Sequence, residues 1–309
     1  MLKQNQLVGP WAGLPIAWKS DDSFDEKIYR GDVARCCAAK VPGVYTGGTT
    51  GEFYALEFEE FKAVTDATIQ ECRNGHVPVM IGCTSTFTLG AVRRAQYAAG
   101  KGADAIQIAL PFWMEVPDGE VVSFFKQVSD AVPGMPITIY ETRRAKKAIS
   151  LELHQKIHQA VPAVIGVKSN EATLGHTKEG CAELSKLYHV FVGENMWFEL
   201  GPAGAIGCCS SLVYQNPRIM LKVFDLVIKK NWAELKPWTD KYNRIIFEGL
   251  KPCFDAGCVD SAIDRLLGLS AGFLKTSLRC RGPYPSCTQA QLVQFRAWLK
   301  NNSPEFLEL

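Results

Sequence analysis

Up to residue 208, the pattern of apolar and polar positions alternates between short segments typical of strands and longer segments typical of helices. Short runs rich in Val, Ile and Tyr are each followed by a few polar or Gly residues and then by a longer segment with apolar positions at helical spacing. The short runs predict strands at 13–18, 43–47, 77–83, 105–110, 136–140, 164–168, 189–193 and 204–208. The longer segments predict helices, among them 25–40, 57–73, 88–100, 119–132 and 151–159.

Strands that alternate with helices predict an α/β protein with a parallel sheet. Eight such strands fit a closed (β/α)8 TIM barrel better than an open sheet, because doubly wound sheets usually have fewer strands and carry a Gly-rich dinucleotide turn. The sequence contains neither a G-x-G-x-x-G nor a Walker motif. We therefore predict a (β/α)8 barrel.

The chain beyond the eighth strand is predicted to be helical. The expected helices lie at 217–230, 232–247, 261–267 and 288–301. Thr288 suits the N-cap of the last of them, and no Ser-rich or charged linker precedes this region. We expect residues 1–214 to form the barrel and residues 215–309 to supply its last helix and a C-terminal helical extension packed on it.

Composition limits the partners of this protein. Apolar residues make up 47% of 309 residues, which is enough to bury a full core, and 34 Lys and Arg against 32 Asp and Glu give a net charge of +2. Such a balance produces no overall field that would attract nucleic acid or an anionic membrane surface. A small molecule is the expected partner.

The sequence is typical of a cytoplasmic protein. No stretch approaches the roughly 20 apolar residues that span a bilayer, and MLKQNQLVGPWAG lacks an apolar run of signal-peptide length. The 11 cysteines are scattered without a C-x-x-C pair, which indicates reduced thiols. A loop disulfide between Cys280 and Cys287 is the alternative, and a reducing compartment disfavours it.

The residues that end the fifth and sixth strands are candidates for chemistry, because the active site of a barrel lies at the carboxyl ends of its strands. The run VIGVK ends in Lys168, where partial desolvation favours a neutral amine that attacks carbonyls. The run ITIY ends in Tyr140, whose phenol can exchange protons beside that amine. Taken singly, Lys168 fits a surface or ion-paired lysine equally well, and Tyr140 fits a packing residue better.

The segment GGTTGE after the second strand is a candidate carboxylate site. Thr49 and Thr50 offer hydroxyls, Gly48 lets the backbone approach a ligand, and the N–H groups that follow are expected to belong to a helix start. An N-cap with a tight turn accounts for the same residues when the motif stands alone.

Together, GTTGE at 48–52, the strand ending at Tyr140 and IGVK ending at Lys168 resemble the dihydrodipicolinate synthase and N-acetylneuraminate lyase family over nearly the whole chain. The resemblance implies a class I aldolase-type lyase that needs no metal or cofactor. Lys168 would form an imine with a 2-oxo acid, Tyr140 would relay protons, and Thr49 with Thr50 would hold the carboxylate. The carbonyl of Ile206 matches a position that faces substrate and tyrosine in this family.

Several residues depart from the family pattern. Where members carry Pro-Tyr-Tyr after the fourth strand, this sequence has Trp113 in place of the tyrosine that a neighbouring subunit supplies to the relay, and an indole cannot relay protons as a phenol does. ETRRAKK replaces Asn-x-Pro after Tyr140, and Ala145 stands where synthases have a carboxylate-binding arginine. The changes at Trp113 and Ala145 argue against dihydrodipicolinate synthase itself. Ala17 and Trp18 replace an early Thr-Pro, which removes another hydroxyl and suggests a reshaped, more aromatic pocket.

Further residues have expected roles at the distal part of the substrate. Arg143, in the basic run Arg143 to Lys147, either binds a distal carboxylate or phosphate or lies in a solvated loop, and charge runs of this kind favour the loop. Glu194 and Asn195 occupy positions at which lyases of this family contact substrate hydroxyls. His154 and His158 have the spacing of a metal pair, but no Glu or Cys completes a ligand set, which argues against a metal site.

The leading functional prediction is a Schiff-base lyase that acts on a 2-oxo acid. It would be either a pyruvate-type aldolase or a 2-keto-3-deoxy sugar acid dehydratase. A non-catalytic barrel that binds or senses an oxo acid is the alternative, disfavoured because a pure binder has no need of an amine nucleophile. A metal-dependent aldolase is disfavoured by the absence of a His and carboxylate set at strand ends. The family further implies a homo-oligomer, a tetramer or a dimer.

Overall fold

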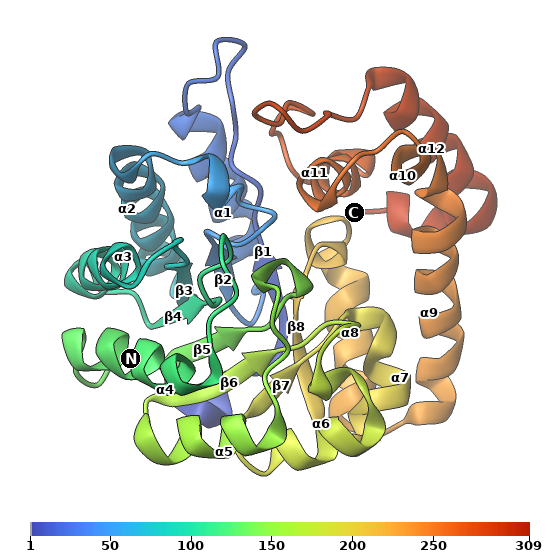
Figure 1. Ribbon diagram of the computed structural model, residues 1–309. Helices are drawn as coiled ribbons and strands as arrows, with labels where there is room; N and C mark the ends of the chain where they lie inside the picture. The colour runs from blue at the N-terminus through green and yellow to red at the C-terminus, as the bar shows by residue number, and fades with distance from the viewer. Residues whose placement is uncertain (1) are drawn as a thin grey trace. The chain divides into compact units, whose positions relative to one another are not determined.

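The computed structural model describes residues 2–309 (Figure 1). Within them, eight strands form a parallel sheet that closes into a barrel in chain order. The strands are β1 (Gly9–Gly13), β2 (Val44–Thr46), β3 (Val79–Gly82), β4 (Ala105–Ile108), β5 (Ile137–Tyr140), β6 (Val164–Lys168), β7 (His189–Phe191) and β8 (Ala205–Ser210). The predicted (β/α)8 barrel is confirmed.

The first strand differs from the prediction. It was expected at 13–18, but β1 ends at Gly13 and its last ladder bond runs from the Leu14 N–H to the Tyr45 carbonyl at 2.9 Å. Pro15 follows, and it has no N–H to donate to a neighbouring strand. Ile16 and Trp18 are buried nonetheless, and this burial outside the sheet explains the apolar run that misled the prediction.

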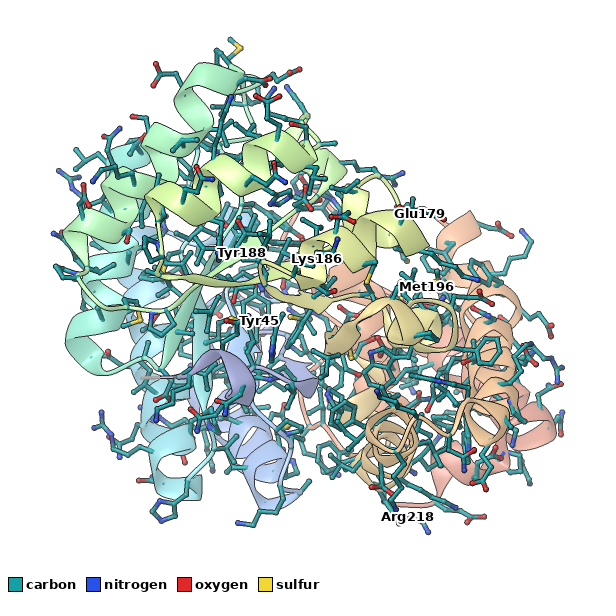
Figure 2. All side chains as sticks on the ribbon, turned by 90° about the horizontal axis from the view of Figure 1, so that it is seen from below. Tyr45, Glu179, Lys186, Tyr188, Met196 and Arg218 are labelled. Carbon is teal, nitrogen blue, oxygen red and sulfur yellow. The ribbon has the colours of Figure 1, made fainter. Side chains whose placement is uncertain are left out.

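The chain divides into two compact units. The first contains Pro78–Cys209 and the N-terminal residues through Gly9. Its helices are α3 (Thr88–Lys101), α4 (Asp118–Ala131), α5 (Leu151–Ala160), α6 (Lys178–Ser185) and α7 (Trp197–Leu200). Helices α3 to α6 pack on one another in chain order, and Figure 1 shows α4, α5 and α6 along the outer side of strands β5 to β7. Figure 2 labels Glu179 and Lys186, which mark the two ends of α6.

The second unit contains Pro10–Val77 and Ser210–Leu309. Its helices are α1 (Glu26–Ala38), α2 (Phe58–Gly75), α8 (Pro217–Ile228), α9 (Trp232–Arg244), α10 (Lys251–Asp255), α11 (Asp260–Ser270) and α12 (Gln289–Asn302). The helices expected after the eighth strand are present, and the Thr288 hydroxyl caps α12 by accepting from the Gln291 N–H at 3.2 Å. The assignment of residues 1–214 to the barrel and 215–309 to an extension stays a prediction. No helix in the described part of the chain is both long and apolar enough to cross a bilayer.

Strands β3, β4 and β5 are buried on both faces, which explains why the sequence shows continuous apolar runs there instead of an alternating pattern. Two polar side chains break the runs. Gln107 on β4 and Thr138 on β5 are partners in the strand register, and both are fully buried. Burial of a polar side chain costs free energy unless it is hydrogen-bonded, so two such residues inside the barrel are candidates for its chemistry.

Gly180 in α6 has a packing reason to be glycine. A Cβ there would lie 2.0 Å from the Leu174 carbonyl oxygen, whereas a Cβ at Gly119 in α4 would meet nothing within 4 Å. We expect Gly180→Ala to lower the free energy of unfolding by about 1 to 3 kcal/mol because backbone must move. Gly119→Ala, the control, should raise it by about 0.4 to 1 kcal/mol. Urea denaturation measures both, and equal effects would contradict the packing account.

Candidate active site

Tyr140 and Lys168 lie side by side at the ends of adjacent strands. They are register partners in the β5–β6 ladder, and the Lys168 Nζ lies 4.3 Å from the centroid of the Tyr140 ring. Tyr140 is 6% exposed. The apolar runs ITIY and VIGVK form the two strands, so each chemical group is delivered as the last residue of a buried strand. The expected neighbourhood of amine and phenol is therefore present.

Cys209 on β8 also faces this amine. Burial raises the pKa of its thiol, while the positive charge of Lys168 and a hydrogen bond from Gln107 oppose the rise. The Gln107 amide nitrogen lies 3.9 Å from the sulfur. The sequence interpretation missed Cys209 and Gln107, although Gln107 carried a signal as the one polar side chain within AIQI.

Glu194 and Asn195 follow β7, as predicted. Both belong to a short 3-10 turn, Glu194–Met196, and Glu194 is 8% exposed. The negative charge of Glu194 raises the pKa of the Cys209 thiol, so Glu194 and Lys168 both act on the same sulfur. Ile206 lies on β8 next to Gly207, whose carbonyl accepts from the Val192 N–H at 3.0 Å. The first unit thus brings Lys168, Tyr140 and Glu194 into one neighbourhood.

The basic run after Tyr140 is only partly solvated. The Arg143 side chain is 69% exposed and lies 3.7 Å from Glu171. By contrast, the Lys146 ammonium donates to the Trp113 carbonyl at 2.6 Å, and Lys147 pairs with Asp118 at 2.7 Å. Two lysines of the run therefore anchor it to the loop after β4, on which the Trp113 side chain is 71% exposed.

The GGTTGE segment belongs to the second unit, and the helix that starts directly after it is a short 3-10 helix and not an α-helix. Residues 47–52 form turns, a 3-10 helix follows at Phe53–Ala55, and α2 begins only at Phe58. Glu52 has a φ of 45°, a left-handed conformation that interrupts helical geometry. Gly48 is needed because a Cβ there would lie 2.2 Å from the Tyr45 hydroxyl (Tyr45 is labelled in Figure 2).

The Thr50 hydroxyl has a protein partner that the sequence did not predict. It donates to the Asp264 carboxylate of α11. Since 214 residues separate the two positions, no local pattern could have indicated the contact. Thr49 is 9% exposed. Whether the two threonines act with Lys168 stays a prediction.

A buried ion pair holds this segment. The carboxylate of Glu52 accepts from the Arg265 guanidinium, from the Trp18 indole N–H at 2.7 Å and from the Arg281 backbone N–H at 2.9 Å. The side chains of Glu52 and Arg265 are both 0% exposed. The carboxylate that ends the GTTGE motif is thus a structural anchor for the turn that carries Thr49 and Thr50.

Among the described residues, no group of three or more His, Cys, Asp or Glu side chains is arranged to hold a metal ion. His154 is fully buried on α5, with its Nε2 atom 3.5 Å from the Glu141 carboxylate. Its spacing from His158 reflects the helix, because the rings of both histidines pack against Tyr188.

Comparison with known proteins agrees with this fold. The model of the dihydrodipicolinate synthetase family matches residues 11–301. A 4-hydroxy-tetrahydrodipicolinate synthase from Nitrobacter hamburgensis is 28% identical over 75% of this chain and 78% of its own. YagE, an E. coli K12 prophage protein solved with pyruvate, superposes with a TM-score of 0.85 at 19% identity, covering 96% of this chain and 98% of its own. A sialic acid aldolase from Ruminococcus gnavus, solved as a catalytic lysine mutant, superposes with a TM-score of 0.84 at 18% identity. The match covers 99% of this chain and 100% of the aldolase chain.

The barrel fold and the match to the family model together define the class of this protein, which is that of the lyases. The chain belongs to the dihydrodipicolinate synthetase family. The predicted family resemblance is confirmed.

The Glu52 and Arg265 pair predicts a large stability effect. Arg265→Met would leave a carboxylate buried without its countercharge, so we expect the free energy of unfolding to fall by about 3 to 5 kcal/mol. Lys126→Gln removes an exposed pair with Asp130 and should change it by at most about 0.5 kcal/mol. Guanidinium denaturation monitored by circular dichroism measures both variants. A loss at Arg265 no larger than at Lys126 would refute the anchoring role.

Proposed function

We propose that this protein is a Schiff-base lyase in which Lys168 condenses with the carbonyl of a 2-oxo acid. The observation that carries the proposal is the contact between the Lys168 amine and the Tyr140 ring at 4.3 Å, made at the carboxyl ends of neighbouring barrel strands. Active sites of (β/α)8 enzymes lie at these strand ends. A family protein solved with pyruvate and a sialic acid aldolase solved as a catalytic lysine mutant support the same chemistry.

The chemistry follows from the two side chains. A neutral Lys168 amine adds to C2 of the oxo acid, and the resulting carbinolamine loses its hydroxyl as water when a proton is delivered to it, leaving an iminium ion. The Tyr140 phenol is the proton carrier beside the amine. The iminium then accepts the electron pair released when the C3–C4 bond breaks, as in aldol cleavage, or when a proton is removed from C3. In the second case the resulting enamine expels the C4 hydroxyl, which leaves as water once a proton is delivered to it. Because the lysine supplies this electron sink, the reaction needs no metal and no cofactor.

The substrate carboxylate is assigned to the GTTGE segment. Thr49 and Thr50 are the proposed donors, with Gly48 in the adjoining turn, and the Ile206 carbonyl is proposed to face the substrate. Thr50 already donates to Asp264, so a substrate carboxylate would have to compete for that hydroxyl or bind the neighbouring N–H groups. Asp264 is therefore expected to weaken carboxylate binding through charge repulsion.

The distal half of the substrate distinguishes the two reactions. Glu194 and Asn195 are proposed to contact its hydroxyls, and the buried carboxylate of Glu194 suits a polyhydroxylated sugar acid. Trp113 and Arg143, both largely exposed, are proposed to line the entrance. An aldolase would release pyruvate and an aldehyde, whereas a dehydratase would release water and a deoxygenated oxo acid. A homodimer or homotetramer in the cytoplasm belongs to the same proposal.

Borohydride reduction in the presence and absence of pyruvate tests the imine. We expect a pyruvate-dependent mass increase that peptide mapping assigns to Lys168, and we expect Lys168→Ala to lose both the adduct and all turnover. Lys178→Ala is the matched control, because Lys178 is an exposed lysine of the same unit, and it should behave as the native chain.

An adduct elsewhere, or none in the folded native chain, would contradict the proposal. That result would favour the second reading, a barrel that binds an oxo acid without forming a bond to it. The two readings differ at once in this experiment, because reversible binding leaves no product after reduction and dialysis.

Tyr140→Phe tests the proton carrier. The ring is retained, so packing against Lys168 should persist while the phenolic proton is lost. We expect the rate of imine formation with pyruvate to fall by about 100-fold or more, with half-saturation by pyruvate changed little, as for a group that acts in proton transfer. Timed borohydride quenching measures both quantities. An unchanged rate would remove Tyr140 from the mechanism.

A further inference from the structure

Directly behind Tyr140 and Lys168 lies a buried charged cluster that the reaction does not use. Side chains alternate between the two faces of a strand, so the residues that follow Tyr140 and Lys168 point to the opposite face, toward the helices. These residues are Glu141 and Ser169, 3% and 2% exposed. Helix α5 contributes His154, which is 0% exposed.

The Glu141 carboxylate joins three segments. One oxygen accepts from the Ile149 N–H at 3.2 Å, and the other accepts from the Ser169 hydroxyl at 3.4 Å and lies 3.5 Å from the His154 Nε2. The Glu141 carboxylate thus ties the end of β5 to the end of β6, to Ile149 in the segment that leads into α5, and to α5 itself.

The backbone of Glu141 reinforces the same junction. Its N–H donates to the Lys168 carbonyl at 2.9 Å, and its carbonyl accepts from the Asn170 side chain at 3.0 Å. Every link acts on a residue directly next to Tyr140 or Lys168. A shift of Glu141 would therefore move the amine and the phenol relative to each other.

A buried carboxyl group costs free energy unless hydrogen bonds or a basic neighbour compensate its burial. His154 is the basic group that faces it from α5, and the Tyr188 ring lies 5.7 Å from the His154 ring. Tyr188, labelled in Figure 2, also donates its hydroxyl to the His154 carbonyl at 2.8 Å, and on its other side it packs against His158. Burial and the Glu141 charge both raise the pKa of the Tyr188 phenol, so this phenol stays neutral.

We propose that Glu141, paired with His154 behind the sheet, is a positioning residue that sets the alignment of the Tyr140 phenol with the Lys168 amine. The inference rests on the proposed Schiff-base function. Misplacement of reacting groups by about 1 Å costs on the order of 100-fold in rate, so a cluster that never touches substrate can control imine formation.

The test uses the full chain and pyruvate, with timed borohydride quenching and mapping of Lys168. Glu141→Gln keeps the size and an acceptor for the Ile149 N–H but removes the charge. We expect its limiting rate of adduct formation to fall about 10-fold to 100-fold, with half-saturation by pyruvate changed less than about threefold. His154→Gln, which leaves the Tyr140–Glu141 backbone untouched, should slow the rate similarly and tests the pair even if the first variant folds poorly.

Replacing both members of the pair should restore function, because neither side chain is then left buried beside a mismatched neighbour. Glu141→Gln with His154→Gln is expected to recover to within about threefold of the native rate. Tyr188→Phe is the structural control, which loses a hydrogen bond on the same helix. It should lower the melting temperature without changing the rate.

The outcomes separate this inference from the function on which it rests. A native chain that forms no Lys168 adduct overturns both. If the native chain forms the adduct, three results would overturn the positioning role alone. These are a native rate in Glu141→Gln, a rate in Tyr188→Phe as slow as in Glu141→Gln, and a double variant no faster than either single variant.

Discussion

The register between β5 and β6 is the constraint on which the candidate site depends. It pairs Tyr140 with Lys168 and brings the amine to 4.3 Å from the ring centroid. A slip of one residue would turn one of the two side chains to the opposite face and separate them. The bond from the Glu141 N–H to the Lys168 carbonyl extends this ladder beyond the strand, so the register is held on both sides of the reactive pair.

Much of the fold could be predicted from the sequence because parallel strands buried on both faces leave continuous apolar runs. The strand at 164–168 was placed correctly at both ends. The first strand was not, since the burial of Ile16 and Trp18 extends an apolar run beyond Gly13, where the strand ends. Periodicity records burial and cannot tell a strand from a buried loop.

The candidate site divides in the same way. Tyr140 and Lys168 could be found because both end apolar strands, where a polar side chain stands out. The partner of the Thr50 hydroxyl could not be predicted, because Asp264 lies 214 residues further along the sequence and no local pattern indicates the contact. Glu141 was recognised only as a departure from the family pattern. The sequence gives no indication that a glutamate just before a basic run is buried against His154 of the following helix, α5.

The account rests on a covalent bond between one lysine and a 2-oxo acid, and the most direct measurement is a crystal structure of the native chain soaked with pyruvate. The account predicts continuous density from the Lys168 Nζ to C2 of pyruvate, with the Tyr140 hydroxyl beside the new bond and the carboxylate on Thr49 or Thr50. Pyruvate bound away from Lys168, or bound beside it with the amine unmodified, would contradict the central claim.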